Sequence, residues 1–299
     1  MKIRKKQKPE WLKRTLPTGP EYERMKKLLS GNNLNTVCQE AKCPNQFECF
    51  SKGTSTFMIM GEKCTRNCNF CAVQNNPIDL PDLKEPKRVS KTVEKMNLSY
   101  VVITSVTRDD LEDGGASFFA ETIREIKKLN KDILVEVLIP DFQGNKKALK
   151  TVLDAKPDVL NHNIETVPSL YHRVRPEAIY ERSLDLIKRS KAYAPGIPTK
   201  SGLMVGLGEK KEDLIQTFQD LVEHGCDALT IGQYLQPSKD HLPVEQFVTP
   251  EDFENLREIA LEKGFIEVAS GPFVRSSYQA ASLFEKVNNC SQHIEHNQI

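Results

Sequence analysis

Short apolar runs alternate with longer amphipathic segments through most of the 299 residues of the chain. Apolar runs such as Val101–Thr104 are typical of β-strands that are buried on both faces. The predicted strands are Thr56–Met60, Tyr100–Ser105, Ile133–Leu138, Val159–Asn163, Thr199–Gly206 and Ala228–Gly232. The predicted helices between them are Ser90–Met96, Ala116–Leu129, Lys146–Leu153, Tyr180–Ala194 and Lys211–His224. Repeated strand–helix units predict a parallel sheet with its helices on the outside.

This alternation predicts an α/β fold with six β/α units. Once both ends are set aside, the chain is shorter than the ~250 residues of a complete eightfold barrel. We therefore expect an open partial (β/α)6 barrel over residues 53–265. A cysteine-rich N-terminal extension at 1–52 and a short C-terminal extension at 266–299 complete the predicted organisation. The active sites of such sheets lie at the carboxyl ends of the strands.

Charge and hydropathy exclude several classes of function. The 42 Lys and Arg residues nearly balance the 41 Asp and Glu residues, so the net charge is +1. This balance gives no global attraction to nucleic acid or to a membrane surface. No apolar run approaches the roughly 20 residues that span a bilayer, and the Lys-rich N-terminus lacks the apolar region of a secretory signal. We therefore expect a cytoplasmic protein with neither a nucleic-acid nor a membrane partner.

The cysteines are concentrated in one short region, because six of the eight lie in two groups of three. The first group, here called the Cys38 triad, has Cys-x4-Cys-x5-Cys spacing and consists of Cys38, Cys43 and Cys49. The second, here called the Cys64 triad, has Cys-x3-Cys-x2-Cys spacing and consists of Cys64, Cys68 and Cys71. In a cytoplasmic chain such groups favour a metal or catalytic site over disulfides.

The number of thiols in each triad narrows the choice of metal. Soft thiolates select zinc, copper(I) or iron–sulfur clusters. A structural zinc site is almost always closed by four ligands, and the histidine nearest to the Cys64 triad is the distant His162. A [4Fe–4S] cube can instead be held by three thiolates with one iron left open. Two open cubes therefore fit the triads better than zinc, and a non-catalytic zinc-binding module is the alternative hypothesis.

A family resemblance follows from these residues. The Cys64 triad, with Phe70 before its last cysteine, resembles the cluster motif of the radical S-adenosylmethionine (SAM) enzymes. With the Cys38 triad upstream and Arg275-Ser-Ser-Tyr278 near the other end, the chain resembles the lipoyl synthase family from about Trp11 to Tyr278. The resemblance implies two [4Fe–4S] clusters. The Cys64 triad would hold the cluster that binds SAM, and the Cys38 triad with Ser277 would hold an auxiliary cluster.

The same resemblance implies the reaction and its partners. The family inserts sulfur at carbons 6 and 8 of a protein-bound octanoyl-lysine and uses two SAM molecules for each lipoyl group. The implied substrates are octanoylated lipoyl domains of 2-oxoacid dehydrogenase acyltransferase subunits, or the H protein of glycine cleavage. A small electron-transfer protein and an iron–sulfur carrier are the other implied partners. Another radical SAM enzyme with an auxiliary cluster is the alternative within the superfamily.

Polar residues that follow the predicted strands are candidates for binding SAM. Asp109 has a carboxylate for the ammonium group of SAM, although an acid at a helix N-terminus has a purely structural use as well. Asn163 and Glu165 share one face of their segment because alternate strand residues point the same way, and together they suit a ribose diol. His162 points the other way and is interpreted as structural. The full set of candidates is Phe70, Thr104, Asp109, Asn163, Glu165, Gly206 and Tyr234.

Several of these assignments keep an alternative. Gly206 ends a Gly-rich strand that resembles the strand by which the family's backbone approaches adenine, and backbone crowding explains such a glycine equally well. Phe70 and Tyr234 suit either an adenine contact or the core. Arg173 and Arg175 follow the fourth strand, and the sequence does not decide between a role at the substrate and surface ion pairs.

Overall fold

The computed structural model describes residues 8–13, 20–32, 34–41, 43–51, 55–75 and 79–296. Its centre is an eight-stranded sheet in the order β1-β2-β5-β6-β7-β8-β9-β10. The strands are β1 (Asn35–Thr36), β2 (Thr56–Ile59), β5 (Tyr100–Ser105), β6 (Leu134–Leu138), β7 (Val159–Asn161), β8 (Thr199–Val205), β9 (Ala228–Gln233) and β10 (Glu267–Gly271). The short strand β1 is antiparallel to β2, and all other neighbours in this sheet are parallel.

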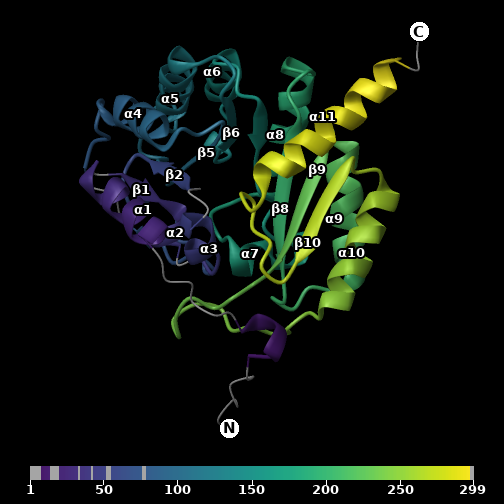
Figure 1. The fold of residues 1–299 in the computed structure, drawn as a ribbon. Helices are drawn as coiled ribbons and strands as arrows, with labels where there is room; N and C mark the ends of the chain where they lie inside the picture. Colours follow the sequence, from purple (N-terminus) through teal and green to yellow (C-terminus); the bar gives the residue numbers. More distant parts are fainter. Residues whose placement is uncertain are drawn as a thin grey trace.

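Six helices alternate with the strands and lie outside the curved sheet (Figure 1). They are α4 (Glu85–Met96), α5 (Ala116–Leu129), α6 (Lys146–Asp154), α8 (Tyr180–Tyr193), α9 (Lys211–Glu223) and α10 (Pro250–Lys263). Because each helix follows one of the strands from β2 to β9, the structure contains the six predicted β/α units. The prediction of an open partial (β/α)6 barrel is confirmed.

Three elements of this architecture were not predicted from the sequence. Strand β10 pairs with β9 and extends the parallel sheet into the segment assigned to the C-terminal extension. Strand β1 joins the sheet from the N-terminal extension. Helix α10 connects β9 to β10 and completes the sixth unit. The domain boundaries themselves remain a prediction.

The remaining elements are short or lie at the ends of the chain. They are η1 (Glu10–Leu12), α1 (Pro20–Gly31), α2 (Val37–Glu40), α3 (Gln46–Ser51), β3 (Lys63–Cys64), β4 (Gln74–Asn75), η2 (Phe142–Gly144), η3 (Pro168–Leu170), α7 (Tyr171–Val174) and α11 (Ala280–His296). In the described ranges, no helix is long and apolar enough to cross a membrane.

Two apolar cores fill the space between the sheet and its helices. One lies under the first strands and contains the fully buried Phe57, Ile103 and Phe119. The other lies under the last strands and contains Ile231 and Phe218. Burial of each such side chain contributes roughly 1.5–3 kcal/mol. These cores fix the strands in place, so the loops at the carboxyl ends of the strands rest on a rigid framework.

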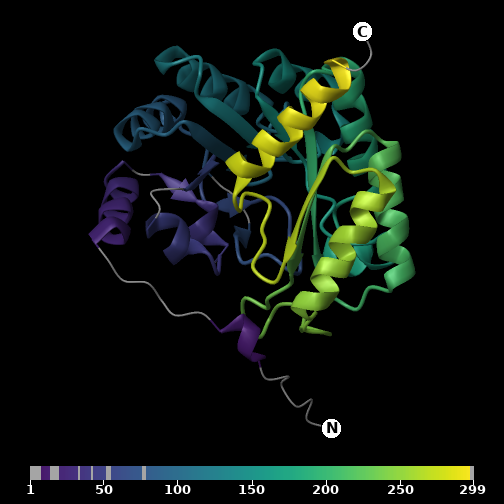
Figure 2. The same cartoon turned by 45° about the vertical axis from the view of Figure 1, so that its right-hand side comes forward.

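Helix α11 crosses the end of the sheet at which the strands begin (Figure 2). Its Leu283 and Val287 pack on Ala228, the first residue of β9. The Phe284 ring lies 6.1 Å from the ring of Tyr100, the first residue of β5. The helix therefore covers this end of the barrel, and the opposite end holds the large cavity described below.

A buried ion pair lies inside the barrel beneath α11. Lys200 Nζ lies 2.9 Å from Glu136 Oε1, and both side chains are 1% exposed. The Tyr100 hydroxyl donates a 2.6 Å hydrogen bond to the other carboxylate oxygen of Glu136. A buried charge is tolerated only when it is paired and hydrogen-bonded, and these contacts satisfy that condition.

Candidate active site

A cavity of about 580 Å³ opens at the carboxyl ends of the strands. Its walls come from the ends of β5 to β9, from both cysteine triads and from the segment after β10. All six cysteines of the triads and Ser277 line this one cavity. The structure therefore brings together residues that are separated by up to about 240 positions in the sequence.

Cys64 ends β3, and Cys68 and Cys71 follow it on the loop to β4, which pairs with β3 as a short two-stranded sheet. The backbone N–H of Cys71 donates to the Cys68 carbonyl at 3.0 Å and closes a tight turn. Burial raises the pKa of Cys71 to about 12, and the nearby Cys68 and Cys64 thiols act in the same direction. A bound cation reverses such an effect because it stabilises thiolates.

The Cys38 triad is built on two short helices. Cys38 lies in α2, whose N-cap Thr36 accepts a hydrogen bond from the Gln39 N–H at 3.3 Å. Cys49 lies in α3, and the backbone N–H of Cys43 donates to the Cys38 carbonyl at 3.1 Å. Burial raises the pKa of Cys38 to about 12, and both other thiols of the triad contribute to the rise.

The segment after β10 packs against the Cys38 triad. The Asn45 side chain donates to the Phe273 carbonyl at 2.7 Å, and the Tyr278 hydroxyl donates to Glu48 at 3.1 Å. Ser277 lies between these two contacts in the sequence and lines the cavity. These two contacts therefore hold the segment that contains Ser277 against the segment that carries the Cys38 triad.

The donor sets fit clusters better than single ions. Within the described ranges, no three His, Cys, Asp or Glu side chains lie close enough together to hold one metal ion. A tetrahedral zinc site requires its ligands to meet at one point, and a [4Fe–4S] cube held by thiolates is larger than a single ion. Each triad offers three thiols to the cavity, the number that holds an open cube and one fewer than a closed tetrahedral zinc site requires.

Five of the seven predicted SAM contacts line the cavity, namely Phe70, Thr104, Asn163, Glu165 and Tyr234. Asn163 Nδ2 donates to Glu165 at 3.0 Å, so the two side chains lie together. The strand alternation that predicted this does not extend to them, because β7 ends at Asn161. Burial raises the pKa of Glu165, and the nearby cations Arg175 and Arg275 oppose this rise.

Asp109 and Gly206 do not line the cavity. The Asp109 carboxylate instead makes a bidentate ion pair with Arg66, at 2.6 and 3.0 Å. Gly206 has a φ of 98° and turns the chain at the end of β8. A Cβ at Gly206 would lie 2.4 Å from the Gln246 carbonyl oxygen, so the residue is required by backbone crowding. For Gly206 the structural alternative is the one that the geometry supports.

The structure also separates the two arginines that the sequence left undecided. Arg173 lies at the surface and pairs with Glu245 at 2.8 Å. Arg175 lines the cavity, and its guanidinium donates to the Asn163 carbonyl at 3.0 Å and to the Tyr171 hydroxyl at 3.1 Å. Its charge also acts against the rise that burial causes in the pKa of Cys68.

His162 lines the cavity, although its contacts support the structural interpretation. One ring nitrogen is 2.8 Å from the Ile139 carbonyl oxygen, and the other is 3.0 Å from the Ser183 hydroxyl. Burial and then the charge of Arg175 lower the pKa of His162 to about 4. The imidazole is therefore neutral at pH 7, and both of its nitrogens have partners.

Several residues of the site were missed from the sequence. Ser276 exchanges hydrogen bonds with the Asn163 amide at 2.7 and 2.9 Å, although the prediction concerned its neighbour Ser277. Arg66 lies inside the Cys64 motif but was given no role, and Asp141 follows β6 in the same way as the predicted residues follow β5 and β7. The position of Asp141 after a strand was the available signal.

The lowered pKa of Asp141 predicts how the free energy of unfolding depends on pH. Burial would raise the pKa of this carboxyl group, but the hydrogen bonds and charge of Arg66 outweigh it and lower the pKa from 3.8 to about 2. A lowered pKa stabilises the fold above the unfolded pKa, and this stabilisation is lost as the pH falls from about 4 to about 2. We expect Asp141→Asn to lose about 2 kcal/mol at pH 7 and almost nothing below pH 2 in urea unfolding. An equal loss at every pH would contradict this assignment.

Comparison with protein families gives two matches along this chain. The model of the radical SAM superfamily matches residues 58–221. A model of the N-terminal domain of lipoyl synthase matches residues 1–43. The first covers the strands and helices around the Cys64 triad, and the second reaches into the Cys38 triad.

Individual relatives agree with these matches. The chain is 61% identical over 279 residues to a lipoyl synthase from Desulfotalea psychrophila, which covers 93% of each chain. It is 54% identical over 281 residues to a lipoyl synthase from Alkaliphilus metalliredigens, with 94% of this chain and 97% of that protein covered. A lipoyl synthase from Caldanaerobacter subterraneus is 56% identical over 273 residues, with 91% and 95% covered.

Solved structures support the fold. Methylornithine synthase superimposes with a TM-score of 0.53 at 16% identity, over 71% of this chain and 69% of the other. SuiB of Streptococcus suis bound to S-adenosylmethionine superimposes with a TM-score of 0.54 at 14% identity, over 73% of this chain and 51% of that one. At these identities the likeness concerns the fold alone.

Proposed function

Because the chain belongs to the lipoyl synthase family of radical SAM enzymes and synthesises the lipoyl cofactor, we propose that it inserts sulfur at carbons 6 and 8 of a protein-bound octanoyl-lysine. These carbons have no acidic proton, so a general base cannot activate them. SAM and a [4Fe–4S] cluster, which the family uses, would supply the radical chemistry that such unactivated carbons require. The observation that carries the proposal is that both triads and Ser277 line one cavity.

In this proposal the Cys64 triad holds the cluster that binds SAM. Asn163 and Glu165 hydrogen-bond the ribose hydroxyls, since their side chains lie together in the cavity wall. Phe70 and Tyr234 flank the adenine, because both line the cavity and pack in one apolar group. Thr104 lies at the end of β5 in the same wall. Asp109 and Gly206 act indirectly, by fixing the loop and the strand end.

The Cys38 triad and Ser277 hold the auxiliary cluster in this proposal, and that cluster is the source of the sulfur. A serine oxygen is a harder and weaker iron ligand than a thiolate, which suits a ligand that must leave as sulfur is removed. The contacts of Asn45 with Phe273 and of Tyr278 with Glu48 support the role, because they hold the segment around Ser277 against the triad.

The substrate and partners follow from the same proposal. Two SAM molecules are consumed for each lipoyl group, one for each carbon. The substrate is an octanoylated lipoyl domain of a 2-oxoacid dehydrogenase acyltransferase subunit, or the H protein of glycine cleavage. A small electron-transfer protein reduces the enzyme, and an iron–sulfur carrier rebuilds the auxiliary cluster, in the cytoplasm. The identity of 54–61% to lipoyl synthases disfavours another radical SAM activity.

An isotope experiment tests the source of the sulfur. The protein is reconstituted with iron and heavy-isotope sulfide, freed of excess sulfide, and given SAM, a reductant and an octanoylated lipoyl domain in a buffer with unlabelled sulfide. We expect both sulfur atoms of the product to carry the label, as measured by mass spectrometry. An unlabelled product would show that the sulfur comes from solution and would overturn the proposal.

A further inference from the structure

The segment Cys64–Arg66 is hydrogen-bonded to the loop that follows β5. The backbone N–H and the hydroxyl of Thr65 both donate to the Thr107 carbonyl at 3.0 Å. In return, the backbone N–H of Asp109 donates to the Thr65 hydroxyl at 3.1 Å. We call these contacts, together with the ion pair between Arg66 and Asp109, the β5 clasp. They connect the first cysteine of the Cys64 triad to the rigid sheet.

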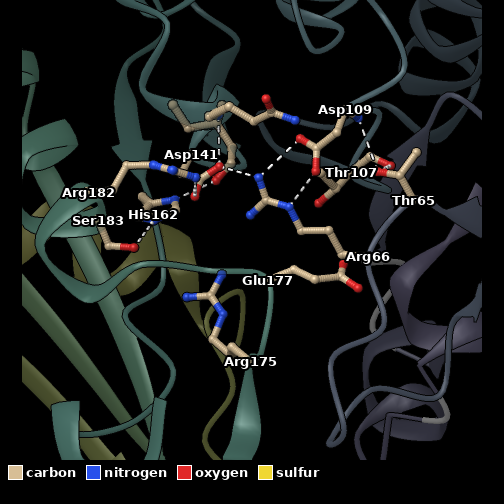
Figure 3. A network of polar contacts seen from close by, with 12 residues as sticks. Thr65, Arg66, Thr107, Asp109, Asp141, His162, Arg175, Glu177, Arg182 and Ser183 are labelled. Carbon is tan, nitrogen blue, oxygen red and sulfur yellow. Dashed lines mark hydrogen bonds and ion pairs between the residues drawn. The ribbon is translucent and has the colours of Figure 1, made fainter. Parts of the chain in front are cut away.

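The side chain of Arg66 strengthens the clasp. Its guanidinium is enclosed between Asp109 and Asp141 (Figure 3). Two N–H groups meet Asp109 at 2.6 and 3.0 Å, and one meets Asp141 at 2.5 Å. Asp141 also receives a longer contact from Arg182 at 3.4 Å. Because the Arg66 side chain is only 4% exposed, these carboxylates fix its position, and its charge is neutralised locally.

The clasp places two backbone donors on one cysteine sulfur. Cys64 Sγ accepts hydrogen bonds from the backbone N–H of Arg66 at 3.4 Å and of Thr107 at 3.3 Å. One donor comes from each side of the clasp, so both bonds depend on its geometry. Hydrogen bonds to the sulfurs are among the factors that set the reduction potential of an iron–sulfur cluster. They stabilise the reduced form because that form carries more negative charge.

We propose that the β5 clasp holds these two N–H groups on Cys64 and thereby raises the reduction potential of the cluster at the Cys64 triad. Thr65, Arg66 and Asp109 are then positioning residues for electron entry. The inference rests on the proposed function, because it assumes that this triad holds the cluster that cleaves SAM. It goes beyond that function by assigning a task to three residues that are not ligands.

Two variants separate the geometry of the clasp from simple charge effects. Asp109→Asn removes a negative charge near the cluster, which by Coulomb's law alone would raise the potential. The same change breaks the bidentate pair with Arg66, so the clasp predicts a lower potential instead. Thr65→Val removes two hydrogen bonds of the clasp without any change of charge. The matched control is Asp110→Asn, since Asp110 pairs with Arg108 outside the clasp.

The test uses the full-length protein with both clusters reconstituted. Iron content is measured first, and the electron paramagnetic resonance signal that changes on addition of SAM is then titrated against applied potential. We expect about a tenfold fall in the ratio of reduced to oxidised cluster at a fixed potential, ~59 mV for one electron, in Asp109→Asn and in Thr65→Val. Asp110→Asn should match the wild type.

The outcomes distinguish this inference from the proposed function. An unchanged reduction potential in Thr65→Val, or a raised one in Asp109→Asn, would overturn the proposed effect of the clasp even if two clusters are present. Should Asp109→Asn fail to hold its cluster, Thr65→Val still decides the question, because the valine matches threonine in shape. Failure of the proposed function would instead appear in the wild type, as a protein with one cluster or with no signal that responds to SAM.

Discussion

Replacing all three cysteines of the Cys38 triad with alanine should reduce lipoyl product to background while SAM is still cleaved to 5′-deoxyadenosine. The reason is that the two triads are proposed to hold different clusters in one cavity. The Cys64 triad runs from the end of β3 into the loop before β4, whereas the Cys38 triad is built on α2 and α3. Removal of the Cys38 triad therefore leaves the Cys64 triad and the proposed SAM contacts in place. Both products are measured in one incubation with an octanoylated lipoyl domain.

The matched control for this variant is Cys226→Ala. Cys226 is a buried cysteine outside both triads, and its thiol donates to the Ala228 carbonyl at 3.3 Å. We expect this variant to form product normally, with a small loss of stability. Lipoyl product from the triple variant, with its remaining cluster intact, would contradict the assigned role of the Cys38 triad as the sulfur source.

Arg175→Met should abolish SAM cleavage and destabilise the fold, whereas Arg173→Met should do neither. The Arg175 guanidinium donates to the carbonyls of Asn163 and Ile164 and to the Tyr171 hydroxyl. Its charge also stands beside Cys68 and Glu165 in the cavity wall. Loss of these charged hydrogen bonds lowers the free energy of unfolding by about 3 kcal/mol, and it displaces the wall that is proposed to bind SAM.

Arg173 is the internal control for this prediction. It lies two residues away and is 44% exposed, and its ion pair with Glu245 lies at the surface. Exposed pairs of this kind contribute only about 0–1 kcal/mol. Methionine keeps most of the length of either side chain while removing the charge. Urea unfolding and 5′-deoxyadenosine formation measure the two effects, and similar behaviour of the two variants would show that the position of Arg175 in the cavity is not important.

The cysteine spacing and the order of the strands were sufficient to predict the framework of the site. Residues after parallel strands must meet at one edge of the sheet, so Asn163 and Glu165 could be placed near Phe70 without a structure. Ser277 was placed by resemblance alone, since nothing in its own neighbourhood shows that Asn45 and Glu48 lie beside it. Strand β10 was not predicted because it has few apolar residues, and its hydrophobic pattern is therefore weak.

Asp109 shows what a sequence cannot supply. A carboxylate after a strand suits a ligand, a helix dipole or an ion pair equally well, and the choice depends on the partner. That partner is Arg66, 43 residues earlier in the chain, and no local pattern connects the two. The sequence could not separate Arg173 from Arg175 either. Their side chains are chemically identical, but Arg173 lies at the surface and Arg175 lines the cavity.

The most direct test of the central claim is the iron and sulfide content of anaerobically reconstituted protein, compared with a variant in which Cys64, Cys68 and Cys71 are all alanine. Two separate [4Fe–4S] clusters predict about eight irons in the wild type and about four in the variant. That result would establish that the two triads are independent sites. Zinc in place of iron would mean that the triads hold no clusters, and loss of all iron from the variant would mean that they form a single site. Either result would contradict the proposed sulfur-donor role of the Cys38 triad.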